Sequence, residues 1–73
     1  MKDICIDYGN YIKAHRIKMG LTQADVAKKL GISQQAYSRY EHGMREPGFD
    51  FIIEIAKILD FNPGEFFDER RKE

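Results

Sequence analysis

The chain has 73 residues, with 12 basic and 12 acidic side chains and no net charge; this length allows one small domain and excludes a separate catalytic or ligand-sensing domain. The lone Cys5 excludes an intramolecular disulfide, and the distant His15 and His42 do not form a paired metal motif, so we expect no metal and no cofactor. No apolar run approaches the ~20 residues of a membrane span, and the acidic N-terminus does not resemble a signal peptide, so we expect a cytoplasmic protein without membrane contacts.

Glycine and proline divide the chain into short segments with helix-spaced apolar residues, which predicts an all-α, compact bundle of about five helices. The first helix is expected over residues 8–19, after an N-cap at Asp7 and before Gly20, which can adopt the left-handed conformation that ends a helix. Its core-facing residues are expected to be Tyr11, Ile12 and Ile17.

The second and third helices have clear start signals. Thr22 is followed three residues later by Asp25, which predicts a capping box, and Gly31 predicts the end of the second helix. Ser33 predicts the N-cap of a third helix over residues 34–41. The apolar residues of these two helices are expected to be Val26, Ala27, Leu30, Tyr37 and Tyr40.

The fourth helix, over about residues 49–59, is apolar almost all round and is therefore the expected centre of the core. Asn62 and Pro63 then predict the N-cap and first residue of a short last helix that includes Phe66 and Phe67. Residues 68–73 have no apolar side chain and are expected to form a frayed tail, so the domain is placed at residues 8–67.

The most informative unit is a helix-turn-helix from Gln23 to His42. Two short helices that cross closely need small residues at the crossing, and Ala27 and Gly31 are four residues apart. Here the sequence resembles the lambda-repressor-like, or Xre-type, helix-turn-helix family, from about Tyr11 to Phe67. The segments that carry the resemblance are HRIKMG, LTQADVAKKLGIS, SRYEHG, REP and IIEIAKIL.

The resemblance implies a sequence-specific DNA-binding regulator, a repressor by our expectation, whose third helix enters the major groove of double-stranded DNA. Four residues of that helix would face base edges: Gln34, Gln35, Ser38 and Arg39. Their amides suit adenine and their guanidinium suits guanine. Four other residues are expected to contact phosphates: Gln23, Ser33, His42 and Arg45. For His42, an interaction with the carbonyls at its own helix end is an equally open alternative.

The distribution of charge agrees with an anionic partner. Residues 11–48 contain seven basic and three acidic side chains, a net charge of +4, whereas residues 49–73 have a net charge of −3.

The resemblance also implies an ion pair between Arg16 and Glu41. The chain differs from many relatives at Tyr37 and Tyr40, whose hydroxyls need hydrogen-bond partners. It also differs at Asp60, where many relatives have a glycine, so we expect a looser turn at the end of the fourth helix.

One small domain reads few base pairs, so we expect a homodimer on a palindromic site. The family pattern turns Phe49, Ile52, Ile55, Ala56 and Leu59 inward. It leaves a stripe for dimer contacts or for another regulatory protein: Phe51, Ile58, Phe61 and Phe67.

Two alternatives stay open, namely that the domain itself covers this stripe, and that the chain is an antitoxin-like protein-interaction module with secondary DNA binding. No catalytic constellation recurs at a useful spacing, so we do not expect an enzyme.

Overall fold

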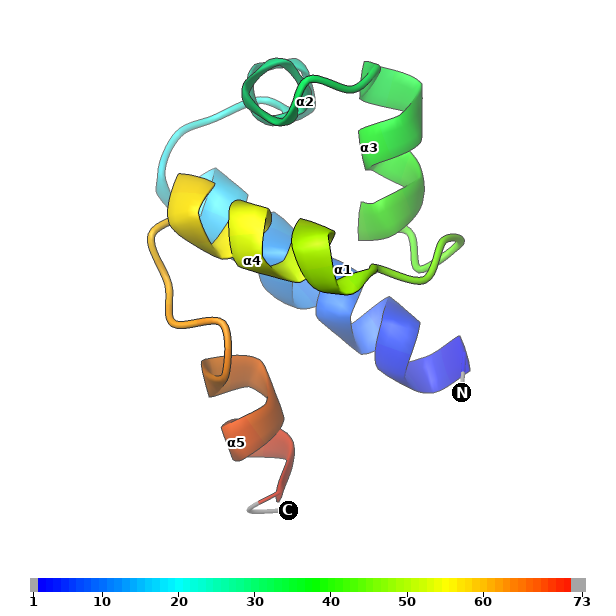
Figure 1. Ribbon diagram of the computed structural model, residues 1–73, viewed down its shortest axis with the longest axis vertical. Coiled ribbons are helices and arrows are strands. Elements are labelled where there is room, and N and C mark those ends of the chain that lie inside the picture. Colours follow the sequence, from blue (N-terminus) through cyan, green and yellow to red (C-terminus); the bar gives the residue numbers. More distant parts are fainter. Residues whose placement is uncertain (1, 72–73) are drawn as a thin grey trace.

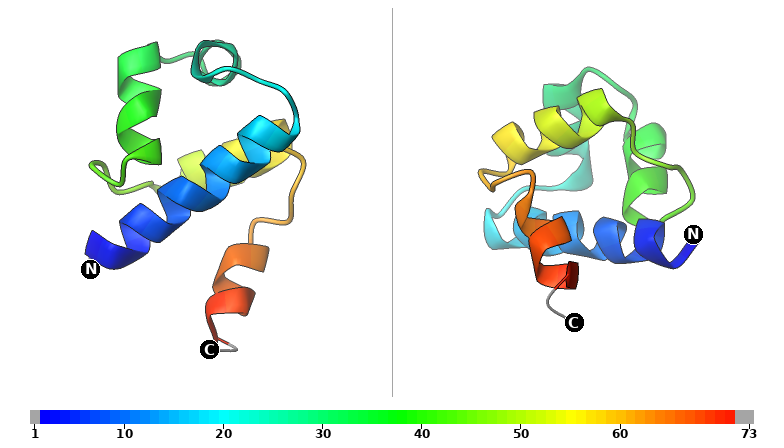
Figure 2. Two further views of the ribbon diagram at one scale, coloured as in Figure 1. Left: turned by 180° about the vertical axis from the view of Figure 1, so that it is seen from behind. Right: turned by 60° about the horizontal axis from the view of Figure 1, so that its bottom comes forward.

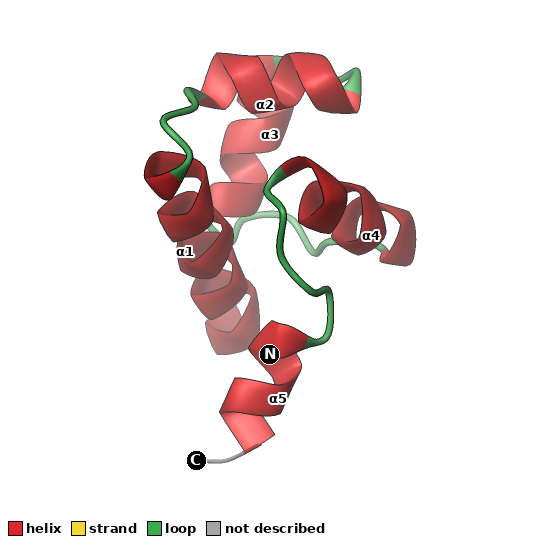
Figure 3. Ribbon diagram, turned by 90° about the vertical axis from the view of Figure 1, so that its left-hand side faces the viewer, coloured by secondary structure: helices red, strands yellow, loops and turns green. Residues whose placement is uncertain are grey.

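The computed structural model describes the backbone of residues 2–71 and the side chains of residues 4–69. Five helices follow one another within this range: α1 (Lys2–Lys18), α2 (Gln23–Leu30), α3 (Gln34–Glu41), α4 (Phe49–Ile58) and α5 (Glu65–Arg71). The all-α prediction is confirmed for the described residues, which contain helices and loops only (Figure 3). None of these helices is long and apolar enough to cross a membrane.

The helices are arranged so that α2 and α3 form one end of the molecule and α5 the other (Figures 1 and 2). The long α1 passes behind α4, and α3 packs against both α1 and α2, while α2 also packs against α4. This arrangement leaves one side of α3 free of other helices.

Local signals determine the ends of α2 and α3. Thr22 Oγ1 accepts a hydrogen bond from Asp25 N at 3.0 Å, and Asp25 Oδ2 accepts one from Thr22 N at 2.9 Å, so the predicted capping box is confirmed. Gly31 ends α2 with φ of 75°, and Ser33 Oγ accepts from Ala36 N at 3.1 Å to begin α3. The two helices are thus joined by a turn whose conformation is specified at both sides.

The outer helices differ from the predicted ones. The first helix starts at Lys2, six residues before the expected start, because Ile4 packs against the core and Cys5 is half-buried on the added turns. The last helix begins at Glu65 instead of Pro63, because Asn62 Oδ1 accepts from Gly64 N at 2.9 Å and closes a turn instead of capping a helix. It continues to Arg71, through most of the expected tail; residues 72 and 73 lie outside the described residues.

The core combines side chains from all five helices: Tyr8, Ile12, Val26, Ala27, Tyr37, Ile55, Leu59 and Phe66. Ile55 of α4 is fully buried, but α4 is not the centre of the core, since Ile12, Val26 and Tyr37 of the other helices are buried to the same extent. The prediction of a core position is wrong for two residues, since Ile17 is 58% exposed and Phe49 is 80% exposed. Both lie near the end of a helix, where part of the apolar face extends beyond the neighbouring helices.

Two backbone features were also predicted incorrectly. Asp60 adopts φ of 58°, and Phe61 N donates to Ala56 O at 3.0 Å, so α4 ends in a tight left-handed turn although no glycine is present. At Gly31, a Cβ atom would meet nothing within 4 Å, so this glycine serves the turn and not a close helix crossing. The close approach lies at Gly9 of α1, where a Cβ atom would be 2.3 Å from the carbonyl oxygen of Glu41.

Candidate nucleic-acid interface

The polar residues predicted to face DNA bases gather on one surface. Gln23 at the start of α2 lines a shallow concavity with four residues of α3, and we call this set the α3 surface: Gln23, Gln34, Gln35, Ser38 and Arg39. Gln34, Gln35 and Arg39 are exposed, and none of their side chains makes a hydrogen bond or ion pair within the described chain. Their donors and acceptors are therefore available to an external partner.

The opposite side of α3 is held by the carboxylate of Glu41, which is only 4% exposed. Arg16 of α1 donates to it twice, from Nε to Oε2 at 2.6 Å and from Nη2 to Oε1 at 3.2 Å. Tyr37 donates its hydroxyl to Oε2 at 2.6 Å, and Gln23 donates from Nε2 to Oε1 at 2.9 Å. One buried carboxylate thus connects α1, α2 and α3, and the expected ion pair between Arg16 and Glu41 is confirmed.

The protonation states in this network follow from its contacts. Burial by itself would raise the pKa of Glu41, but the hydrogen bonds from Arg16, Tyr37 and Gln23 outweigh burial and hold the pKa below its ordinary value. The hydrogen bond to Glu41 raises the pKa of Arg16, and burial together with the same carboxylate raises the pKa of Tyr37. The carboxylate is therefore charged and the Tyr37 hydroxyl neutral near pH 7.

The predicted phosphate contacts are already engaged within the protein to different degrees. One amide hydrogen of Gln23 points to Glu41, which leaves the second one and the unpaired backbone N–H groups at the start of α2 for a phosphate. Ser33 Oγ accepts the capping hydrogen bond from Ala36, so its hydroxyl proton can still be donated.

His42 interacts with its own helix end, as the open alternative stated. Its Nδ1 lies 2.8 Å from the carbonyl oxygen of Ser38 and 3.2 Å from Ser38 Oγ. A neutral ring that donates from Nδ1 to that carbonyl has no proton on Nε2. A phosphate contact through Nε2 would thus require the charged imidazolium form.

Arg45 lies in the loop after α3 and is exposed. Its guanidinium carbon is 5.5 Å from the centre of the Tyr40 ring, which in turn stacks on Phe51 with ring centres 3.8 Å apart. This contact places the positive charge of Arg45 beside the C-terminal end of α3.

The structure also brings forward two residues that the sequence reasoning did not single out. Asn10 and Lys13 of α1 are exposed and line a second concavity together with Gln23 and His42. Their spacing of three residues puts them on one helix face, which the sequence does contain as a signal. The sequence does not indicate that this face of α1 lies beside α3, because the contact between the two helices depends on their close approach at Gly9.

The four side chains expected in a dimer contact are more buried within the chain than the family pattern implied. Phe51, Ile58 and Phe61 are half-buried and pack against the core, so the expectation that the core leaves Phe51 and Ile58 uncovered is wrong. Phe61 contacts the Tyr11 ring at 5.3 Å between centres. Phe67 alone of the four is exposed, at 39%, although it also stacks on Tyr8.

Within the described part of the chain, no group of three His, Cys, Asp or Glu side chains is placed to hold a metal ion. The geometry is that of a helix-turn-helix module, with two short helices joined by a defined turn and the second one presenting unpaired polar side chains on an exposed face. This class of fold is associated with binding in the DNA major groove.

Comparison with known proteins agrees with this class. The helix-turn-helix family model matches residues 12–66, and the chain belongs to this family. The uncharacterized HTH-type transcriptional regulator YqaE of Bacillus subtilis is 43% identical over 53 residues, which are 73% of this chain and 46% of YqaE. Repressor protein C2 of Salmonella phage P22 is 33% identical over 55 residues, which are 75% of this chain and 26% of C2.

A solved structure is similar over nearly the whole molecule. The restriction-modification controller protein C.AhdI from Aeromonas hydrophila superposes with a TM-score of 0.82 and 25% sequence identity, covering 89% of this chain and 94% of that one. In contrast, the chain spans about half the length of YqaE. The resemblance to the lambda-repressor-like family is therefore confirmed.

Proposed function

We propose that the chain is a DNA-binding transcriptional regulator that reads an operator through the major groove with α3, and that it acts as a repressor. The observation that carries this proposal is the α3 surface, where Gln34, Gln35 and Arg39 have no partner within the described chain. The names of the relatives, which include transcriptional regulators and one repressor, support it. DNA as the partner also supports our expectation of a cytoplasmic location.

In this proposal, α3 contacts base edges through four residues: Gln34, Gln35, Ser38 and Arg39. A second set of hydrogen-bond donors, on both sides of these four residues, contacts phosphates. This set contains Gln23, Ser33, His42 and Arg45, to which we add Asn10 and Lys13 because they line the neighbouring concavity. Phosphate contacts fix the position of the protein on the duplex, whereas base contacts discriminate sequences. The two groups can therefore be separated experimentally.

The test begins with selection of bound sequences from a random DNA pool, followed by titrations with single variants. Arg39→Ala is expected to weaken binding to the selected site by roughly 1 to 3 kcal/mol and to relax discrimination at one base position. Arg45→Ala and Lys13→Ala are expected to weaken binding to all sequences alike and to make the salt dependence shallower by about one counterion. Lys57→Ala, whose side chain is exposed on α4, is the matched control and should change neither quantity.

Selection of no preferred sequence, with only weak and strongly salt-dependent binding, would contradict the proposal. That outcome would favour the alternative of a protein-interaction module. The exposure of Met44 at 75% and Phe49 at 80% is the observation that favours this alternative, because large apolar side chains at a surface often mark protein contacts.

We further propose that two copies bind a palindromic operator as a homodimer through the α4–α5 region, with Phe67 at the contact and Phe51, Ile58 and Phe61 supporting it from the core. Phe67→Ser is expected to shift sedimentation toward the monomer and to weaken operator binding while the half-site preference is kept. Met44→Ser also replaces a large exposed apolar side chain, but in the loop after α3 and outside the α4–α5 region, and should leave the dimer intact. A dimer that persists in Phe67→Ser at equal concentration would place the contact elsewhere.

A further inference from the structure

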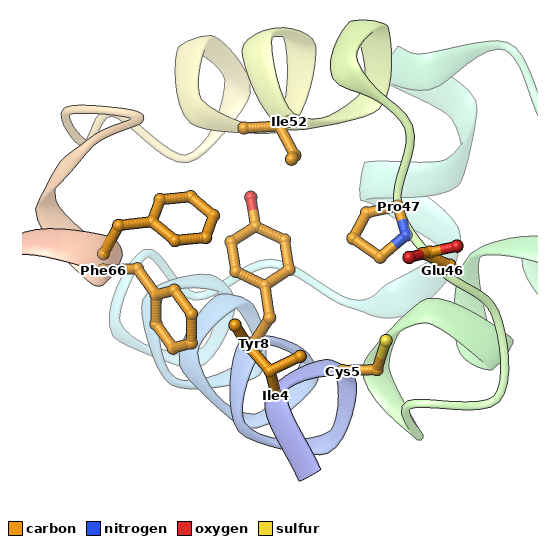
Figure 4. Close-up of a pocket in the computed structure, with 8 residues that line it drawn as sticks. Ile4, Cys5, Tyr8, Glu46, Pro47, Ile52 and Phe66 are labelled. Carbon is orange, nitrogen blue, oxygen red and sulfur yellow. The ribbon is translucent and has the colours of Figure 1, made fainter. Parts of the chain in front are cut away.

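A small apolar cavity lies between α1, α4, α5 and the loop that follows α3 (Figure 4). Its volume is about 180 Å³, and it is partly open to solvent; its lining includes Ile4, Tyr8, Ile52 and Phe66, together with the exposed Phe67 and the exposed carboxylate of Glu46. None of its lining residues belongs to the α3 surface or to the neighbouring concavity of Asn10 and Lys13. The DNA-binding role proposed above therefore gives no reason for this cavity.

One polar atom inside the cavity has no partner. The Tyr8 residue is only 3% exposed, and its hydroxyl makes no hydrogen bond within the described chain. In Figure 4 the Tyr8 ring rises from α1 and its hydroxyl points toward Ile52 of α4, with Pro47 on one side and Phe66 on the other. An unsatisfied buried hydroxyl is costly for a folded protein, whereas the buried hydroxyl of Tyr37 is satisfied by Glu41.

The surroundings of the Tyr8 hydroxyl define what it can bind. Burial raises the pKa of Tyr8 to about 12, so the hydroxyl keeps its proton near pH 7 and is a hydrogen-bond donor. A single trapped water would be poorly held, because a buried water needs two or more polar partners; among the lining side chains the Tyr8 hydroxyl is the one buried group without a partner, and the Glu46 carboxylate is exposed. An anionic ligand is disfavoured by the Glu46 carboxylate, and the apolar walls that make up most of the lining would not replace the hydration of any ionic group.

We propose that this cavity is a binding site for a small uncharged organic ligand that carries one carbonyl oxygen, which accepts a hydrogen bond from the Tyr8 hydroxyl. The volume fits a molecule with one ring and a short substituent, because an apolar cavity of about 150 Å³ is sufficient for benzene. The ligand would contact α1, α4, α5 and the loop at the same time, and its binding would stabilise their packing. This site is independent of the proposed contact with DNA.

The test compares two probes of nearly identical shape, acetophenone and α-methylstyrene, in which a carbonyl oxygen replaces a methylene group. We expect saturable changes in the methyl NMR signals of Ile4 and Ile52 with acetophenone, and an affinity about tenfold higher than for α-methylstyrene. Tyr8→Phe is expected to remove this preference by weakening acetophenone alone. Because that variant removes an unsatisfied hydroxyl, it should fold at least as well as the original chain.

Tyr11→Phe is the matched control. The Tyr11 hydroxyl is also buried but lies beside the Glu65 carboxylate, and Tyr11 is not among the residues that line the cavity, so the preference for acetophenone should remain. The proposal is wrong if acetophenone causes no saturable change at Ile4 and Ile52, or if Tyr8→Phe keeps the preference. The protein concentration is held constant throughout, because Phe67 lines this cavity and is also the residue proposed at the dimer contact.

Discussion

Replacing Glu41 with glutamine is expected to lower the free energy of unfolding by about 3 to 5 kcal/mol, because it leaves the guanidinium of Arg16 buried without a counter-ion. The side chains of the pair are only 12% and 1% exposed, so water cannot compensate for the lost charge. A loss of this size is a large part of the stability of a small domain. Urea unfolding at pH 7, followed by far-UV circular dichroism, measures the change.

The chain contains a matched control for this substitution. Glu54 and Lys57 form an ion pair on α4 at 3.7 Å, with side chains that are 57% and 70% exposed. Glu54→Gln makes the same chemical change at the surface, where the expected loss is below about 1 kcal/mol. Equal effects of the two substitutions would contradict the role given to the buried carboxylate.

The pH dependence provides a second measurement on the same residue. The pKa of Glu41 is lower in the folded protein than its ordinary value of 4.5, so its stabilising contribution is complete above that value and is lost as the pH falls through the folded pKa. The original chain is therefore expected to lose stability on acidification more steeply than Glu41→Gln. The difference between the two curves isolates Glu41 from the other carboxylates.

Adding a single methyl group at Gly9 is expected to cost about 3 kcal/mol or more. The new Cβ atom would lie 2.3 Å from the carbonyl oxygen of Glu41 and 2.6 Å from that of Tyr40, and neither backbone atom can move without shifting α3. The higher helix propensity of alanine recovers only about 1 kcal/mol of this cost. The change should appear as a lower urea midpoint.

Gly64→Ala is the control for this substitution, because its Cβ atom would meet its nearest atom, Asn62 Oδ1, at an ordinary 3.5 Å. We expect the stability of Gly64→Ala to stay within about 0.5 kcal/mol of the original. Should Gly9→Ala be as stable as Gly64→Ala, α1 and α3 would not approach each other as closely as the structure describes.

Features that depend on neighbours in the sequence could be predicted from it. The capping box of Thr22 and Asp25 and the cap at Ser33 involve residues three apart, and the left-handed turn at Gly31 follows from the properties of glycine. For the same reason α2 and α3 have the expected ends. The predicted start of α1 is wrong because Asp7 is a plausible N-cap by its residue type, whereas the packing of Ile4 against the core depends on distant contacts.

The candidate site was predictable to a similar extent. The residues of the α3 surface follow from the resemblance, and so does the pair of Arg16 and Glu41. The bond from Gln23 to the same carboxylate joins residues 18 positions apart, so nothing local in the sequence indicates it. The wrong expectation for Phe51 has the same origin, since its cover is supplied by Tyr40 from another helix.

The division of work on α3 has a consequence for protein engineering. Tyr37 and Glu41 hold the helix in place through the buried network, whereas the side chains of Gln34, Gln35 and Arg39 make no hydrogen bond or ion pair with the rest of the described chain. The side chains proposed to contact bases are thus separate from those that stabilise the position of the helix. A different set of three residues could be grafted at these positions to create a new DNA preference on an unchanged scaffold.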